Sequence, residues 1–126
     1  MPNPPLLKIK LQIMCGDEIA MGPGKADLLD AVAREGSISA AGRALGMSYR
    51  RAWMLVDVMN RCWREPVVAT TPGGSAGSGA RVTPFGQDIL AQYRLLQKQA
   101  NEARSGQHWR ALEKNILRRP RGEDKG

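Results

Sequence analysis

The chain has 126 residues, enough for one domain with a buried core but too few for two typical domains. Nineteen Lys and Arg residues outweigh twelve Asp and Glu residues, so the net charge is +7. No apolar run approaches the roughly 18 residues that a membrane-spanning helix needs, and no secretory signal is apparent, so we expect a cytoplasmic protein without a membrane partner. One His and two Cys residues exclude most dedicated zinc sites, so neither a metal site nor a cofactor is predicted.

The positive charge is concentrated in two parts of the chain. Residues 34–81 hold seven Arg, no Lys and three acidic residues, and residues 104–126 hold seven basic and three acidic residues. Arg outnumbers Lys by 13 to 6, and the guanidinium group forms paired hydrogen bonds with phosphates and guanine edges. An acidic or nucleic-acid partner is therefore favoured, although the tail by itself is more typical of a solvated surface.

The first third of the chain predicts a small β-hairpin followed by a helix. Apolar and polar residues alternate over residues 7–14, which is typical of a half-buried strand, and a turn at 15–18 leads to a short return strand at 19–21. Apolar residues with helical spacing follow, and Gly36 is expected to close that helix.

Residues 37–64 predict two helices joined by a tight turn, which is a helix-turn-helix. Ser37 and Ser39 are candidate N-caps of the first helix, Gly46 ends it, and Ser48 caps the second. The second helix has a buried apolar stripe at helical spacing, made of Ala52, Leu55, Val56 and Met59. Trp53 is expected at the edge of that stripe, in a packing role, and Trp63 in the core.

The N-terminal end of the second helix carries exposed polar and basic residues. This end of a recognition helix meets base edges in the major groove, and its free N–H groups also suit a phosphate. With an arginine from the following ribbon, the candidate DNA-binding residues are Ser37, Ser39, Ser48, Tyr49, Arg50, Arg51, Met54 and Arg81. The alternative is an ordinary helical hairpin whose arginines are only solvated.

A β-ribbon and a long helix are predicted next. Residues 67–71 and 81–83 flank the Gly-rich stretch 72–80, which is not a phosphate-binding loop because no Gly-Lys-Ser/Thr follows it. Thr83-Pro84 begins a helix that runs to about residue 104. Its apolar residues repeat at spacings of four and three, as in a helix–helix seam, and we expect them to form a homodimer interface: Ile89, Tyr93, Leu96, Ala100 and Ala103. Alternatively, a short last helix containing Trp109 folds back over this seam.

These elements predict a mainly α protein with a small β-sheet. The expected architecture is a winged helix-turn-helix with an N-terminal β-hairpin and a long C-terminal dimerisation helix. The domain is expected to cover residues 6–105, with the dimerisation helix beginning at about residue 84. Residues 106–126 are expected to form a short helix and a basic tail.

Seven short segments occur in the order found in a known family. They are residues 7–12, 36–39, 47–49, 52–53, 59–60, 73–79 and 82–86. In these segments the chain resembles the N-terminal DNA-binding domain of the ModE-type molybdate-dependent transcriptional regulators and, more distantly, the winged helix of LysR-type regulators. The resemblance implies a homodimer that binds specific double-stranded DNA, often as a repressor linked to molybdenum metabolism. The family's β-rich molybdate-binding modules do not fit into the residues after Gly106, so no molybdate site is expected in this chain.

No nucleophile, base and orienting group can be brought together from the sequence, so an enzyme is not predicted and no catalytic residue is proposed. Asp27 and Asp30 share a helix face and are expected to contact solvent. Cys15 and Cys62 are far apart in sequence, and Cys62 is expected to be a half-buried packing residue. Two alternative functions stay open: a winged-helix protein-interaction module and a non-specific nucleic-acid binder.

Overall fold

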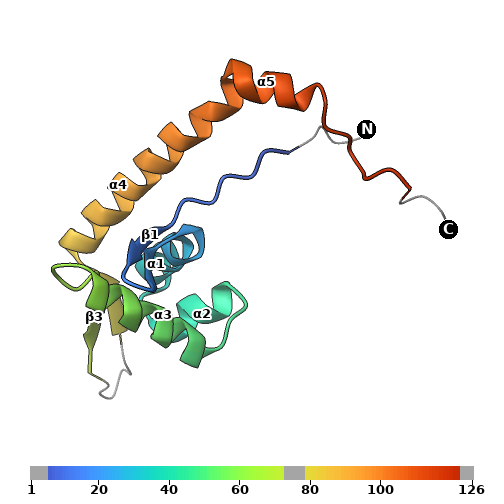
Figure 1. Cartoon of the computed structure of the whole chain (residues 1–126). Helices are drawn as coiled ribbons and strands as arrows, with labels where there is room; N and C mark the ends of the chain where they lie inside the picture. The colour runs from blue at the N-terminus through green and yellow to red at the C-terminus, as the bar shows by residue number, and fades with distance from the viewer. Residues whose placement is uncertain (1–5, 73–78, 123–126) are drawn as a thin grey trace.

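The computed structural model describes residues 6–72 and 79–122, and it confirms the predicted fold class. Three helices form the centre of a compact body, a hairpin lies on each side of them, and a long helix extends outward (Figure 1). The elements in chain order are β1 (Ile13–Cys15), β2 (Glu18–Met21), α1 (Pro23–Glu35), α2 (Ile38–Ala44), α3 (Tyr49–Cys62), β3 (Val68–Thr71), β4 (Gly79–Val82), α4 (Pro84–Asn101), a 3₁₀ turn (Glu102–Ser105) and α5 (Gln107–Glu113). This is a winged helix with an additional N-terminal hairpin. The glycine-rich residues 73–78 lie outside the described part of the chain.

Capping residues set the boundaries of the three central helices. Gly36 has a φ of 77° and ends α1, as predicted, because this left-handed conformation suits glycine. The Ser37 Oγ accepts a hydrogen bond from the Ala40 N–H at 3.0 Å, so Ser37 is the N-cap of α2 and Ser39 is not. The Ser48 Oγ accepts one from the Arg51 N–H at 3.1 Å and caps α3, which ends at Cys62, two residues earlier than expected.

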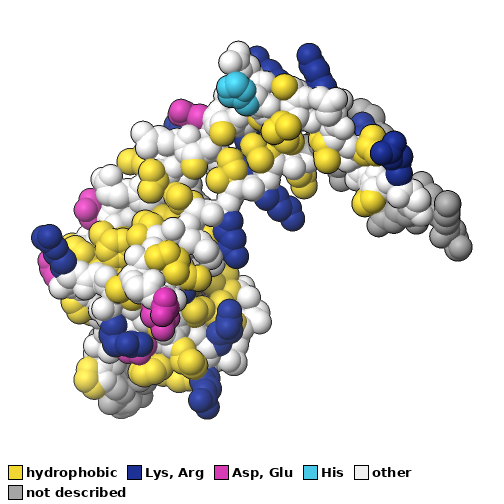
Figure 2. Space-filling model, viewed as in Figure 1, with side chains coloured by type: hydrophobic (Ala, Val, Ile, Leu, Met, Phe, Trp, Pro, Cys, Tyr) yellow, Lys and Arg dark blue, Asp and Glu magenta, His cyan; other side chains and the backbone are white. Residues whose placement is uncertain are grey.

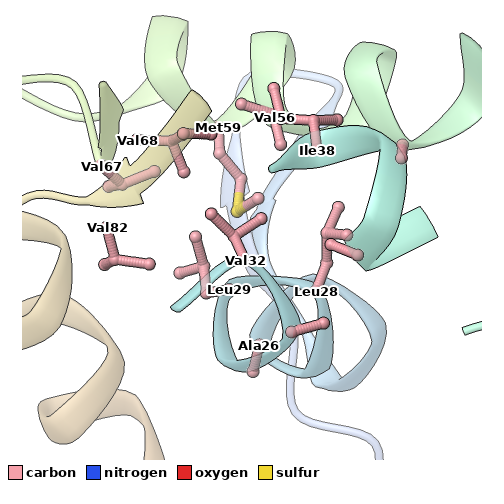
Figure 3. Close-up of a cluster of buried hydrophobic side chains, with 14 of the residues drawn as sticks. Ala26, Leu28, Leu29, Val32, Ile38, Val56, Met59, Val67, Val68 and Val82 are labelled. Carbon is pink, nitrogen blue, oxygen red and sulfur yellow. The ribbon is translucent and has the colours of Figure 1, made fainter. Parts of the chain in front are cut away.

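The core lies between α1, α3 and the β3–β4 hairpin. Figure 3 shows Met59 of α3 pointing toward Val32 of α1, with Val68 and Val82 of the hairpin on one side. Gly42 lets α2 approach α3 closely, since a Cβ on Gly42 would lie 3.1 Å from the Cβ of Ala52. The helix-turn-helix is therefore packed as one unit with the hairpin that follows it.

The predicted N-terminal strand over residues 7–14 is largely wrong. Only Ile13–Cys15 pairs with β2, with an irregular register between Ile13 and Met14. Residues 6–12 run alongside α4 without a strand partner (Figure 1). The Tyr93 hydroxyl of α4 donates a 2.7 Å hydrogen bond to the Leu11 carbonyl, and Arg104 donates one to the Leu7 carbonyl. The alternating burial is real, but it comes from contact with a helix rather than from a sheet.

The predicted seam on α4 divides into two parts. Tyr93 is 2% exposed inside the core of its own chain, which leaves almost none of it for a second copy, and Ile89 is partly buried against the same core. Leu96, Ala100 and Ala103 lie farther along, where the helix extends beyond the body, and Leu96 is 41% exposed. The first part of the seam therefore packs within its own chain, because helical spacing identifies an apolar face but not its partner.

Candidate nucleic-acid interface

The N-terminal end of α3 projects from the body as an exposed basic surface. Tyr49 is 56% exposed, and Arg50, Arg51 and Met54 are also exposed. Neither guanidinium group has a hydrogen-bond or ion-pair partner among the described residues. Two guanidinium groups, each with five N–H donors, are thus available to an external acceptor. They lie at the end of the helix that is expected to contact DNA.

A groove lies beside this end of α3, bounded by the N-terminal end of α2 and by the β3–β4 hairpin. Its volume is about 540 Å³ and it is open to solvent. The lining residues are Ser37, Ile38, Ser39, Tyr49, Trp53, Thr70, Thr71, Pro72, Gly79 and Ala80. Hydroxyl groups and two aromatic rings therefore face one space, and such side chains commonly contact the sugar–phosphate backbone of DNA.

Trp53 is in the groove rather than in the core. Its side chain is 47% exposed, which is incompatible with the predicted packing role. Trp63, by contrast, is half-buried against the core, and its indole N–H donates a 3.1 Å hydrogen bond to the Ala20 carbonyl of β2. Trp63 is the extended residue that follows α3, so its ring is positioned by the end of the helix rather than by a helix face.

The remaining arginines of the central block differ in their partners. Arg34 pairs with the neighbouring Glu35 at 3.3 Å, and Arg61 pairs with Asp57 at 3.1 Å. Arg43 instead donates a 2.8 Å hydrogen bond to the Ser39 hydroxyl, which lines the groove. Its positive charge is therefore held next to the groove without an acidic partner among the described residues.

Arg81 is exposed but does not join this cluster. In the hairpin, Thr70 is directly opposite Ala80, and both line the groove, while Ala69 is opposite Arg81. Thr71 and Gly79 line the groove as well, but Arg81 is not among the lining residues. The structure brings together Ser37, Ser39 and Tyr49 at the groove beside the start of α3, and Arg81 does not line that groove.

Asn60 connects α3 to the hairpin, and the sequence analysis missed it. Its side-chain oxygen accepts hydrogen bonds from the N–H groups of Val67 at 2.8 Å and Val68 at 3.1 Å. Its side-chain nitrogen donates to the Val68 carbonyl at 3.0 Å. From the other side, the Ala80 N–H donates to the Gly36 carbonyl at 2.8 Å. These bonds fix the hairpin relative to the helix-turn-helix and so set the width of the groove.

The described residues contain neither a grouped set of metal ligands nor a membrane-spanning helix. Within residues 6–72 and 79–122, no three His, Cys, Asp or Glu side chains are grouped so that they could hold a metal ion. In the same residues, no helix is both long and apolar enough to cross a lipid bilayer.

Curated proteins similar to this chain include several molybdenum-related proteins. A molybdenum-pterin-binding protein, MopB of Rhodobacter capsulatus, is 49% identical over 73 residues, which are 58% of this chain and 27% of MopB. A DNA-binding transcriptional dual regulator, ModE of Escherichia coli K12, is 35% identical over 91 residues, which are 72% of this chain and 33% of that protein. The chain is homologous to the ModE-type proteins.

The ModE-type relatives also include the molybdenum transport protein ModE of Azotobacter vinelandii, 40% identical over 78 residues, or 62% of this chain and 29% of that protein. The chain spans about a third or less of the length of these relatives. Their names describe binding, transport and regulatory proteins. No family model matches the chain, and the comparisons give no support to the more distant LysR resemblance.

Proposed function

We propose that this protein is a sequence-specific DNA-binding regulator of transcription that places α3 in the major groove. The observation that carries the proposal is the position of Arg50 and Arg51 at the capped start of α3, beside the hydroxyl-lined groove, with side chains that are exposed and have no partner among the described residues. The name of the Escherichia coli relative, a DNA-binding transcriptional regulator, supports the same function.

In this arrangement different side chains contact different parts of the duplex. Arg50 is the candidate for paired hydrogen bonds to a guanine edge, since Arg is the commonest reader of guanine in the major groove. Ser37, Ser39 and Ser48 are candidates for hydrogen bonds to phosphate oxygens, which fix register without specifying sequence. Tyr49 and Trp53 supply apolar contact with sugar or with a thymine methyl group.

We further infer a homodimer that forms through the extended part of the chain. Residues 6–12, α4 and α5 form an extended arm. Among the described residues, most of the large apolar side chains that are exposed away from the DNA-facing surface lie on or beside this arm: Leu6, Leu95, Leu96, Leu112, Ile116 and Leu117. The exceptions are Leu45 and Met14 of the β1–β2 hairpin. Apolar side chains follow the concave side of this arm in Figure 2. Burial of this surface between two copies related by a twofold axis would present two recognition helices to successive major grooves, about 34 Å apart.

Residues 6–105 then form the DNA-binding and dimerisation unit, and residues 106–126 form a short helix and a basic tail. We propose that the regulated genes serve molybdenum metabolism, because the relatives carry molybdenum-related names. We also propose that binding represses these genes, as the family resemblance implies.

Selection of bound duplexes from a random pool, with scrambled duplex as competitor, tests this function. We expect an enriched palindrome whose half-sites are about 10 base pairs apart, or a multiple of that distance. Retention of duplexes without any enriched sequence would contradict the proposal and favour a non-specific binder. A chain that retains no duplex would instead favour a protein-interaction module.

A further inference from the structure

Two cysteines that are remote in sequence meet at the junction between the N-terminal hairpin and α3. Cys15 is the last residue of β1 and Cys62 is the last residue of α3. The thiol groups of Cys15 and Cys62 lie within hydrogen-bonding reach of each other, and both cysteines are free. The sequence analysis treated Cys62 as an isolated packing residue, so it missed this pair.

Other contacts place the same two segments together independently of the thiols. Cys15 is directly opposite Glu18 in the hairpin. Glu18 is close enough to Cys62 for its negative charge to raise the pKa of the Cys62 thiol. The residue after Cys62 is Trp63, whose indole N–H donates to the Ala20 carbonyl of β2 at 3.1 Å. The end of α3 is thus bonded to the hairpin at the residue next to Cys62.

The two thiols differ in their accessibility. Cys15 is exposed, whereas Cys62 is half-buried. Burial raises the pKa of the Cys62 thiol, and the hydrogen bond with Cys15 raises it further. An external reagent therefore meets Cys15 first, and Cys62 is positioned to react with whatever Cys15 has become.

We propose that Cys15 and Cys62 form a reversible disulfide by exchange with a low-molecular-weight disulfide such as oxidised glutathione. The Cys15 thiolate attacks one glutathione sulfur, forms a mixed disulfide and releases one glutathione thiolate. Cys62 then loses its proton to solvent and its thiolate attacks the Sγ of Cys15, which releases the second glutathione. Two protein thiols are oxidised to one disulfide, and one glutathione disulfide is reduced to two thiols.

The bond would close a loop that contains α1, α2 and α3. Crosslinking distant parts of a chain reduces the freedom of the unfolded state, so the oxidised protein should resist denaturant better than the reduced protein. Cys62 is at the opposite end of α3 from Tyr49, roughly 20 Å away at 1.5 Å per residue, so the DNA-facing end need not move. The inference does not depend on the proposed function.

The test is to incubate the folded, reduced full-length chain with oxidised glutathione, block remaining thiols with iodoacetamide, and measure intact mass and linked peptides. We expect a chain lighter by two hydrogen atoms, with the peptides of Cys15 and Cys62 joined. In denaturing urea, where the two residues are not held together, we expect mixed disulfides to persist instead. A folded wild-type chain that keeps glutathione on Cys15, or that does not react, would overturn the proposal.

Matched variants assign the two steps. Cys62→Ser should accumulate a mixed disulfide on Cys15, because the thiol that resolves it is gone. Cys15→Ser should react several-fold more slowly, because the remaining thiol is half-buried. Wild-type protein, compared with itself before and after oxidation, should show a higher urea midpoint when oxidised, and dithiothreitol should reverse the shift. A lower midpoint after oxidation would show that the native positions do not suit the bond.

Discussion

The side-chain amide of Asn60 bonds both backbone groups of Val68, accepting from its N–H at 3.1 Å and donating to its carbonyl at 3.0 Å. One residue of α3 thereby bonds the backbone at the start of β3, where Val68 is also paired with Val82 of β4. Because α3 carries the candidate DNA-reading residues and the hairpin forms the other side of the groove, this contact fixes the geometry of the interface. The groove is thus maintained by a residue that does not line it.

Replacement of Asn60 tests this role. Asn60→Ala leaves the buried backbone groups of Val67 and Val68 without these partners, and we expect a loss of about 2–4 kcal/mol in the free energy of unfolding. Urea denaturation of the reduced protein measures the loss. Asn115→Ala is the matched control, since Asn115 makes one exposed bond to Ala111 and should change stability by less than about 0.5 kcal/mol.

Arg50 is predicted to discriminate between bases. Arg50→Ala should weaken binding to the preferred duplex by about 1–3 kcal/mol and relax the preference at one base position. Arg61→Ala, on the same helix but paired with Asp57, is the control and should leave the preference unchanged. Fluorescence anisotropy with single-base-pair variants of the duplex provides the measurement. Unchanged affinity and preference in Arg50→Ala would contradict the assignment of the helix end.

Arg81 is predicted to act on phosphate only. It is exposed on the hairpin but does not line the groove next to α3, so we expect it to contact the DNA backbone rather than bases. Arg81→Ala should weaken all duplexes similarly and reduce the slope of log affinity against log salt by about 0.9. Titrations at several salt concentrations measure this slope, and a selective loss on one sequence would contradict the prediction.

Leu96 is predicted to lie in the dimer interface. Leu96→Glu places a charge on the exposed part of α4, so it should produce monomers and sharply weaker operator binding. Gln87→Glu adds the same charge to the same helix on the opposite side and should stay dimeric. Light scattering at micromolar concentration distinguishes these states. A wild-type protein that is monomeric both free and on DNA would exclude the dimer and the palindromic site.

Tyr93 is predicted to make stability fall in alkali. Burial raises the pKa of the Tyr93 hydroxyl above 10.0, so the folded state keeps its proton longer than the unfolded state does. The contribution of the protonated Tyr93 hydroxyl to stability is complete below its pKa in the unfolded state. It is lost as pH rises through its pKa in the folded state. Tyr93→Phe should therefore lose the bond to Leu11 and show a smaller fall in urea midpoint above pH about 10 than wild type. Equal falls in both proteins would contradict this.

Local signals in the sequence predicted most of the fold. Ser48 and Gly36 act through their own backbone neighbours, so their capping roles were visible from sequence and are confirmed. The strand over residues 7–14 was wrong because α4, not a second strand, half-buries alternate side chains there. In these cases the pattern was correct, and only the long-range partner was missing from the sequence.

The site was predicted less completely, for the same physical reason. The start of α3 is identified by its cap and its charge, both of which are local. Trp53 was assigned to packing because a helical wheel cannot show that the hairpin leaves space beside it. Asn60 carries no local signal for its bonds to Val67 and Val68, which depend on how the hairpin folds back.

Sequence-specific DNA binding is the central claim, and one competition measurement tests it most directly. The affinity of wild-type protein for the duplex enriched by selection is compared with its affinity for a scrambled duplex of equal length and composition, at one physiological salt concentration. The account predicts that the enriched duplex binds at least roughly 10³-fold more tightly. Equal affinities for the two duplexes would contradict it.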